Sequence, residues 1–131
     1  MKKKINMIKP AAIITGASSG VGKSLAIELS EKYFIYLVSR DIKKLENTKK
    51  IIHRKKNECE IITADLKSEK SVNELFKKIP NNNQIELLIN NAGIAIFKDI
   101  SNTSVDDWDE TINVNLRGAF LMTKSLIDNF K

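Results

Sequence analysis

The chain has 131 residues, of which 42% are hydrophobic, and a net charge of +6 at pH 7, values that are typical of one soluble globular domain. No stretch approaches the roughly 18 uninterrupted apolar residues that can span a bilayer. The lysine-rich start from Met1 to Pro10 lacks the apolar core of a signal peptide. We therefore expect a cytoplasmic protein without a membrane segment. The positive charge comes from 19 Lys and only 3 Arg spread over several segments, a distribution that disfavours a nucleic-acid-binding surface. We expect Lys2-Lys3-Lys4 to be a solvated terminus.

The first half of the chain alternates strand and helix patterns. Two apolar runs, Ala11–Thr15 and Phe34–Val38, predict buried strands. Between them, apolar residues recur at helical spacing, which predicts a helix from Gly20 to about Lys32. Asp41 is a suitable N-cap for a second helix, which carries many lysines.

The second half continues this alternation. Glu60–Ala64 and Ile85–Ile89 predict two further strands, and Ser68–Lys78 predicts the helix between them. A last, long helix is predicted from about Val105 to the end. The order of elements predicts a doubly wound α/β fold of the Rossmann type, with about four parallel strands, right-handed crossovers and helices on both faces of the sheet.

Cysteine and histidine, two common metal ligands, each occur once in this sequence. Cys59 is the only cysteine, which excludes an internal disulfide and a cysteine-based metal site and predicts a reduced, partly buried thiol. The only histidine, His53, falls in a charged helical stretch, where a solvated position is expected. We therefore predict no metal centre.

The loop between the first strand and the first helix is rich in glycine. A glycine-rich turn that follows a strand and opens a helix directs free backbone N–H groups and the positive end of the helix dipole at a phosphate. We expect Gly16 to permit the tight turn, Gly20 the close approach of a pyrophosphate, and Gly22 the close packing of helix on strand. The predicted nucleotide site at this loop consists of Thr15, Gly16, Ser18, Ser19, Gly20, Val21 and Gly22.

The spacing of these glycines resembles a known family. Thr-Gly-x-x-x-Gly-x-Gly at Thr15–Gly22 is similar to the motif of single-domain members of the short-chain dehydrogenase/reductase family. Asn90–Gly93, after the fourth strand, resembles the family's Asn-Asn-Ala-Gly signature, and Asp65 stands where the family places an Asp that contacts the adenine ring. Taken alone, Asp65 could be a helix cap and Asn91 a turn former. All these motifs fall at the carboxyl ends of predicted strands, where ligands bind in open parallel sheets. The resemblance implies that the cofactor is also contacted by Asp65, Leu66, Asn91, Ala92 and Gly93.

The end of the second strand predicts which dinucleotide is preferred. A carboxylate at this position accepts hydrogen bonds from the ribose 2′-OH of NAD(H), whereas the 2′-phosphate of NADP(H) requires a cation. Ser39 stands where the acid would be, and Arg40 follows it. We therefore predict NADP(H) as the preferred cofactor, with NAD(H) as the alternative, and place Ser39 and Arg40 in its site.

The last predicted helix carries an apolar stripe that contains one amide. The stripe consists of Val105, Trp108, Ile112, Ala119, Met122, Leu126 and Phe130. Asn115 falls on the same face, so its amide needs partners in the core; a satisfied core Asn, or one that kinks the helix through a bound water, would account for it. In the family resemblance, however, Asn115 is similar to the active-site Asn that holds a proton-relay water, and we prefer this catalytic role.

The family's proton-transfer residues have no counterpart in this sequence. The resemblance implies hydride transfer between nicotinamide and a carbonyl or alcohol carbon, assisted by a Ser on a fifth strand and a Tyr-x-x-x-Lys after it. The only tyrosines are Tyr33 and Tyr36, and Tyr36 is followed four residues later by Arg40 instead of Lys. We therefore expect residues 1–131 to form one NAD(P)-binding Rossmann domain that is incomplete at its C-terminal side, an amino-terminal fragment or truncated product of such an oxidoreductase.

Two other hypotheses remain open at this point. One is a non-catalytic dinucleotide-binding module or regulatory subunit, and the other is a remnant that never folds. An uncovered sheet edge and a last helix without a neighbour favour association, so we expect a homo-oligomer or another partner at these surfaces. A small carbonyl or alcohol substrate is expected only if the fold is completed, and the sequence does not identify it.

Overall fold

The computed structural model describes residues 9–129, in which strands and helices alternate. The strands are β1 (Ala11–Thr15), β2 (Phe34–Ser39), β3 (Cys59–Thr63) and β4 (Ile85–Ile89). The helices are α1 (Gly20–Leu29), α2 (Ile42–Arg54), α3 (Glu69–Lys77), α4 (Val105–Ile112), the π-helical η1 (Asn113–Arg117) and α5 (Gly118–Asn129). The Lys2-Lys3-Lys4 run and Phe130 lie outside the described residues.

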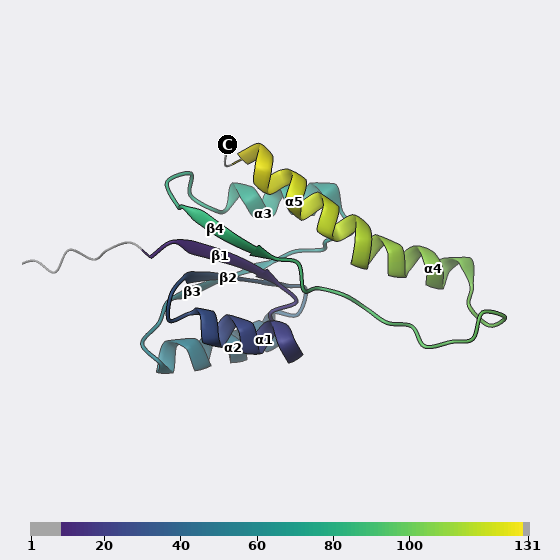
Figure 1. The fold of residues 1–131 in the computed structure, drawn as a ribbon, viewed down its shortest axis with the longest axis horizontal. Helices are drawn as coiled ribbons and strands as arrows, with labels where there is room; N and C mark the ends of the chain where they lie inside the picture. The colour runs from purple at the N-terminus through teal and green to yellow at the C-terminus, as the bar shows by residue number, and fades with distance from the viewer. Residues whose placement is uncertain (1–8, 130–131) are drawn as a thin grey trace, which may run out of the picture.

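The four strands form one parallel sheet in the order β3-β2-β1-β4. Helices cover both faces, with α1 and α2 on one side and α3 and α5 on the other (Figure 1). β1 lies between β2 and β4, and all five of its residues are buried. This arrangement confirms the predicted doubly wound α/β fold. Because all the strands are parallel, their carboxyl ends lie along one edge of the sheet.

Alternating side chains of the strands build two apolar cores. Ile13 of β1 belongs to the core under α3 and α5, together with Met122. Its neighbour Ile14 belongs to the core under α1 and α2, together with Leu45. Successive side chains of a strand point to opposite faces, so a strand covered on both sides is a continuous apolar run, the pattern that made β1 recognisable in the sequence.

The predicted boundaries are close to the observed ones. β1 and β4 have the predicted bounds, and those of β2 and β3 differ from them by one residue. α1 ends at Leu29 instead of about Lys32. The hydroxyl of the buried Ser30 donates a hydrogen bond to the carbonyl of Ile27 at 2.6 Å. Such a local side-chain bond to the backbone competes with continuation of the helix. Asp41 caps α2, as predicted, by accepting the backbone N–H three residues later at 3.1 Å.

The predicted long last helix is present from Val105 to Asn129, but it is not α-helical throughout. Asn113–Arg117 form a π-helical turn between α4 and α5. Such a turn inserts an extra residue into the helix and so changes the face on which later side chains lie. The predicted stripe reaches the core in α5, where Met122 is fully buried, whereas Val105 and Trp108 of α4 are 74% and 61% exposed. α4 extends beyond the sheet, so it has no core to cover (Figure 1).

Candidate functional site

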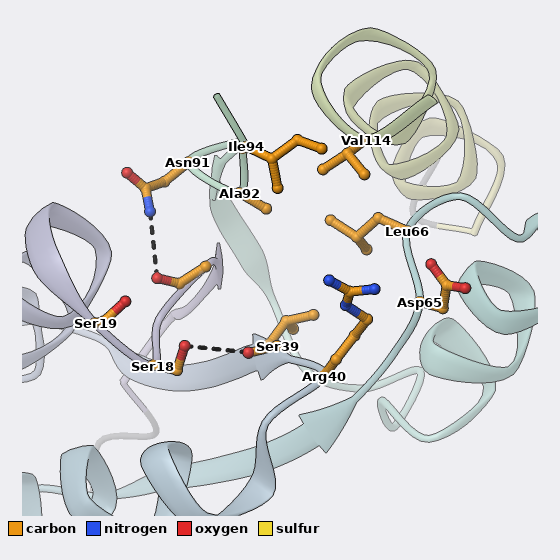
Figure 2. A pocket seen from close by; sticks show the side chains of 13 residues that line it. Ser18, Ser19, Ser39, Arg40, Asp65, Leu66, Asn91, Ala92, Ile94 and Val114 are labelled. Carbon is orange, nitrogen blue, oxygen red and sulfur yellow. Dashed lines mark hydrogen bonds between the residues drawn. The ribbon is translucent and has the colours of Figure 1, made fainter. Parts of the chain in front are cut away.

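A cleft of about 230 Å³ lies at the carboxyl ends of the four strands. Side chains from the loops after β1, β2, β3 and β4 surround it, together with Val114 of η1 (Figure 2). The cleft is lined by Gly16, Ser18, Ser19, Val38, Ser39, Arg40, Asp65, Leu66, Asn91, Ala92, Gly93, Ile94 and Val114. Most of the predicted cofactor residues are thus brought together, whereas Thr15, Gly20, Val21 and Gly22 do not line the cleft.

The glycine-rich loop depends on the absence of side chains. Gly16 and Gly20 have φ angles of +67° and +55°, which favour glycine. A Cβ on Gly16 would lie 2.7 Å from Nδ2 of Asn91. A Cβ on Gly22 would collide with the carbonyl oxygen of Gly16, so the close packing at Gly22 is between α1 and the loop. The space beside Gly20 is open, which leaves its backbone accessible to a ligand.

The N-terminus of α1 is available to an acceptor from outside the chain. Ser19 is its N-cap residue but makes no side-chain capping bond, and the first turn contains no acidic residue. By contrast, the N-cap side chains of α2, α3 and α4 each accept a backbone N–H. The first N–H groups of a helix have no partner within the helix, and with the helix dipole they attract an anion. This end of α1 therefore suits a phosphate group.

Thr15 and Asn91 join the ends of β1 and β4 beneath the cleft. The Thr15 hydroxyl oxygen accepts the backbone N–H groups of Asn91 and Ala92, both at 3.0 Å. The hydroxyl donates in turn to the carbonyl of Ile89 at 3.3 Å. The Asn91 amide donates to the carbonyls of Thr15 and Gly16 at 3.2 and 3.3 Å. Thr15 is buried, so it supports the cleft from below.

The loop after β1 and the end of β2 contribute two hydroxyls and a cation to the cleft. The Ser39 hydroxyl donates to the Ser18 hydroxyl at 3.2 Å (Figure 2). Arg40 is exposed, and its guanidinium makes no hydrogen bond or ion pair with the residues that the structure describes. The guanidinium and the two hydroxyls line the same cleft and together offer several donors to a phosphate.

The loop after β3 forms the other side of the cleft. Asp65 Oδ1 accepts the backbone N–H of Lys67 at 3.1 Å, and the Asp65 N–H donates to the Ser71 hydroxyl at 2.9 Å. The N-cap of α3 is Ser68, whose hydroxyl accepts the Ser71 N–H at 3.2 Å. Asp65 is therefore not the cap of this helix. Leu66, which is buried, adds apolar surface to the cleft.

The predicted inward position of Asn115 is wrong, because its side chain is exposed. Its amide makes two hydrogen bonds with the backbone of Ile94, in which Oδ1 accepts the N–H and Nδ2 donates to the carbonyl, both at 2.8 Å. Asn115 lies in the π-helical turn, which changes the face that its side chain occupies. Asn115 itself does not line the cleft; it holds Ile94, which does.

Sequence reasoning missed three apolar residues of the cleft. They are Val38, Ile94 and Val114. Each adjoins a predicted site residue in the chain, but none belongs to a motif with a chemical role. Adjacency was the only signal in the sequence, because an apolar side chain beside a site is recognisable only once its direction is known.

Residues 9–129 contain no cluster of His, Cys, Asp and Glu side chains that could hold a metal ion. None of the helices in this range is long and apolar enough to cross a membrane. Cys59 is a free, buried thiol. Burial raises its pKa to about 11, so the thiol is protonated at neutral pH.

Residues 10–131 match a family model described as short chain dehydrogenase. The chain is 35% identical to an NAD-dependent glycerol dehydrogenase of Listeria innocua, over 93% of this chain and 48% of that protein. It is also 35% identical to a 3-oxoacyl-[acyl-carrier-protein] reductase of Buchnera aphidicola, over 92% of this chain and 49% of that protein.

The fold is similar to that of an alcohol dehydrogenase from the archaeon Thermococcus sibiricus, solved in complex with 5-hydroxy-NADP. The TM-score is 0.86 at 29% identity, and the match covers 92% of this chain and 53% of that chain. The chain spans about half the length of the curated relatives that it matches.

Proposed function

The chain belongs to the short-chain dehydrogenase family, and on this premise we propose that its cleft binds NADP(H) for an oxidoreductase that transfers hydride between the nicotinamide and a carbonyl or alcohol carbon. The observation that carries the proposal is the cleft itself, which gathers the glycine-rich loop and the ends of four parallel strands around one space. Ligands of open parallel sheets bind at this edge. We place this activity in the cytoplasm.

The described residues fit the phosphates of such a cofactor. The uncapped N-terminus of α1 and the open backbone at Gly20 would hold the pyrophosphate. Arg40, with the Ser18 and Ser39 hydroxyls, would hold the 2′-phosphate. The absence of a carboxylate at Ser39 is our reason to prefer NADP(H) over NAD(H).

The rest of the cleft suits the ring systems of the cofactor. Asp65 offers a carboxylate and Leu66 an apolar surface to the adenine side. Asn91, Ala92 and Gly93 would contact the remainder of the dinucleotide along the loop after β4. The bound nicotinamide supplies or accepts the hydride, and the residues of this chain bind and orient it.

The group that moves the proton is not identified within the sequence. None of the tyrosines in the 131 residues is followed four positions later by a lysine. We propose that this group lies outside these residues, and we keep Asn115 as the active-site Asn implied by the family, acting beside the Ile94 backbone that it binds. The second candidate is a dinucleotide-binding module or regulatory subunit without its own catalysis.

Titration with NADPH and NADH tests the proposed cofactor. We expect saturable nicotinamide fluorescence changes at about micromolar NADPH, within the range usual for enzyme ligands, and weaker binding of NADH. Competition by adenosine 2′,5′-bisphosphate, but less by AMP, would locate the preference at the 2′-phosphate. A protein that binds neither dinucleotide would overturn the proposal. Binding without carbonyl reduction by native protein of 14.8 kDa intact mass would favour the non-catalytic module.

We further propose that the chain self-associates through the exposed face of its last helices. Large apolar side chains lie exposed along this face, at Trp108, Leu116, Phe120 and Ile127. An exposed row of large apolar side chains on a helix can be covered by the same face of a second copy. Light scattering should detect a dimer that Phe120→Glu dissociates; a monomeric wild-type protein at high concentration would contradict this.

A further inference from the structure

Two walls of the cleft come from distant parts of the chain and are joined by an ion pair. One wall is the loop after β3, with Asp65 and Leu66, and the other contains Val114 of η1. Nζ of Lys67, the next residue in that loop, lies 3.1 Å from both carboxylate oxygens of Glu110 at the end of α4. Neither Lys67 nor Glu110 lines the cleft.

Two further contacts hold the same loop against η1 and the start of α5, which follow α4. Nε of Arg117 donates to the backbone carbonyl of Lys67 at 3.5 Å. A Cβ on Gly118 would lie 3.0 Å from Cβ of Leu66, so the absence of a side chain there permits the close approach of α5 to the loop. Leu66 is 9% exposed. The position of this cleft residue is therefore set from the helix side as well as from β3.

The Lys67–Glu110 ion pair is suited to setting the distance between the loop after β3 and α4. The side chains of Lys67 and Glu110 are 29% and 41% exposed, and partly exposed pairs contribute little to the free energy of unfolding. The two-oxygen contact nevertheless fixes the distance between a loop and a helix that are 43 residues apart in the chain. A small shift of either element would move Leu66 relative to Val114.

We propose that Lys67 and Glu110 form a brace across the cofactor cleft, and that Glu110 is a positioning residue for the adenine side of the dinucleotide although it touches no ligand. The identity of the ligand as a dinucleotide rests on the proposed function. The brace is a property of the free chain, so its effect on the loop can be measured without any ligand.

The test compares variants that break the brace with one that breaks an unrelated pair. Glu110→Gln removes the charge and keeps the shape of the side chain, and the double variant Lys67→Glu/Glu110→Lys reverses the pair. Glu74→Gln is the matched control, because it breaks the Lys77–Glu74 pair at 2.9 Å within α3, away from the cleft lining. Affinity for NADPH is measured by titration, and order of the loop by hydrogen exchange at residues 66–68 in the ligand-free protein.

We expect Glu110→Gln to weaken NADPH binding about two- to fivefold, the range for a partly exposed pair, and to accelerate exchange in the loop. The reversed pair should restore both, the control should change neither, and about 1 M salt should shrink the difference from wild type. Unchanged exchange in Glu110→Gln overturns the brace, and faster exchange with unchanged affinity overturns its role in binding. If the wild-type protein binds no dinucleotide, the proposed function fails, while the exchange measurement still decides the brace.

Discussion

The hydroxyl of Thr15 holds the backbone of Asn91, accepting its N–H at 3.0 Å at the same time as that of Ala92. A side chain at the end of β1 thus fixes the first turn of the loop after β4. In turn, the side-chain amide of Asn91 donates a hydrogen bond to the Thr15 carbonyl at 3.2 Å. The floor of the cleft is built by this reciprocal pair, so changes at Thr15 should affect both stability and binding.

Thr15→Val should lower the free energy of unfolding by about 1–3 kcal/mol, because the partly buried Ala92 N–H loses its acceptor and the Asn91 N–H keeps only the Ile89 carbonyl. Valine has nearly the shape of threonine, so packing is preserved. Urea unfolding gives the stability, and NADPH titration should show weaker binding of the folded variant. Thr15→Ser retains the hydroxyl and serves as the control. Equal stability of wild type and Thr15→Val would show that the bonds of Thr15 are dispensable.

Substitution of Arg40 should separate the two dinucleotides. Arg40→Asp removes the free cation of the cleft, and we expect about a tenfold or larger loss of NADPH affinity, as for a charge-assisted phosphate contact. NADH, which lacks the 2′-phosphate, should lose little affinity or gain some. Arg54→Asp, at the far end of α2, changes the net charge equally and controls for long-range electrostatics. Equal losses for both dinucleotides would remove Arg40 from the 2′-phosphate site.

Two glycines of the loop should respond differently to alanine. Gly22→Ala places a Cβ against the carbonyl of Gly16, and such overpacking should cost about 1–3 kcal/mol or more. Gly20→Ala meets no atom but must adopt a φ of +55°, so we expect about 1–2 kcal/mol of strain. Thermal or urea unfolding of both variants measures the difference. A Gly22→Ala protein as stable as wild type would contradict the packing of α1 on the loop.

Removing the Asn115 amide should release the loop after β4. Asn115→Ala loses both hydrogen bonds to Ile94, and the loss in unfolding free energy should be at most about 1 kcal/mol because the site is exposed. Hydrogen exchange at the Ile94 amide should accelerate, and NADPH affinity should fall. Thr111→Ala, which removes a hydrogen bond within α4, is a control for general loosening of the helix. Unchanged protection at Ile94 would show that Asn115 does not hold the loop.

The buried Cys59 predicts a loss of stability at high pH. Its pKa in the folded protein is raised to about 11 from a reference value of 9.0 by burial, so the folded state keeps a proton that the unfolded state has released between these values. The contribution of Cys59 to stability is complete below about pH 9 and is lost as the pH rises through about 11. Urea unfolding at pH 8 and pH 10.5 should show a larger decrease for wild type than for Cys59→Ala. Equal decreases would contradict the raised pKa.

Sequence patterns located the site because its chemistry is local. Gly16 and Gly20 are needed for backbone angles that other residues rarely adopt, and Ser39 and Arg40 stand at a strand end that the apolar run defines. Once the strands are parallel, their carboxyl ends must meet. For this reason most predicted cofactor residues do line one cleft.

The last helix shows where such reasoning fails. A constant period of 3.6 residues placed Trp108 and Asn115 on one inward stripe, but the π-helical turn changes the period and α4 has no sheet beneath it. Local sequence does not reveal either circumstance, because both depend on the path of a loop and the extent of the core.

The sequence by itself determined the order of elements, the glycine-rich loop and the cation at the end of β2, since each depends on residue type and spacing along a short stretch. The tertiary structure alone decided that Asn115 binds the Ile94 backbone, that Val114 reaches the cleft and that Lys67 meets Glu110. These contacts join segments up to 43 residues apart, and their formation depends on how the helices pack on the sheet.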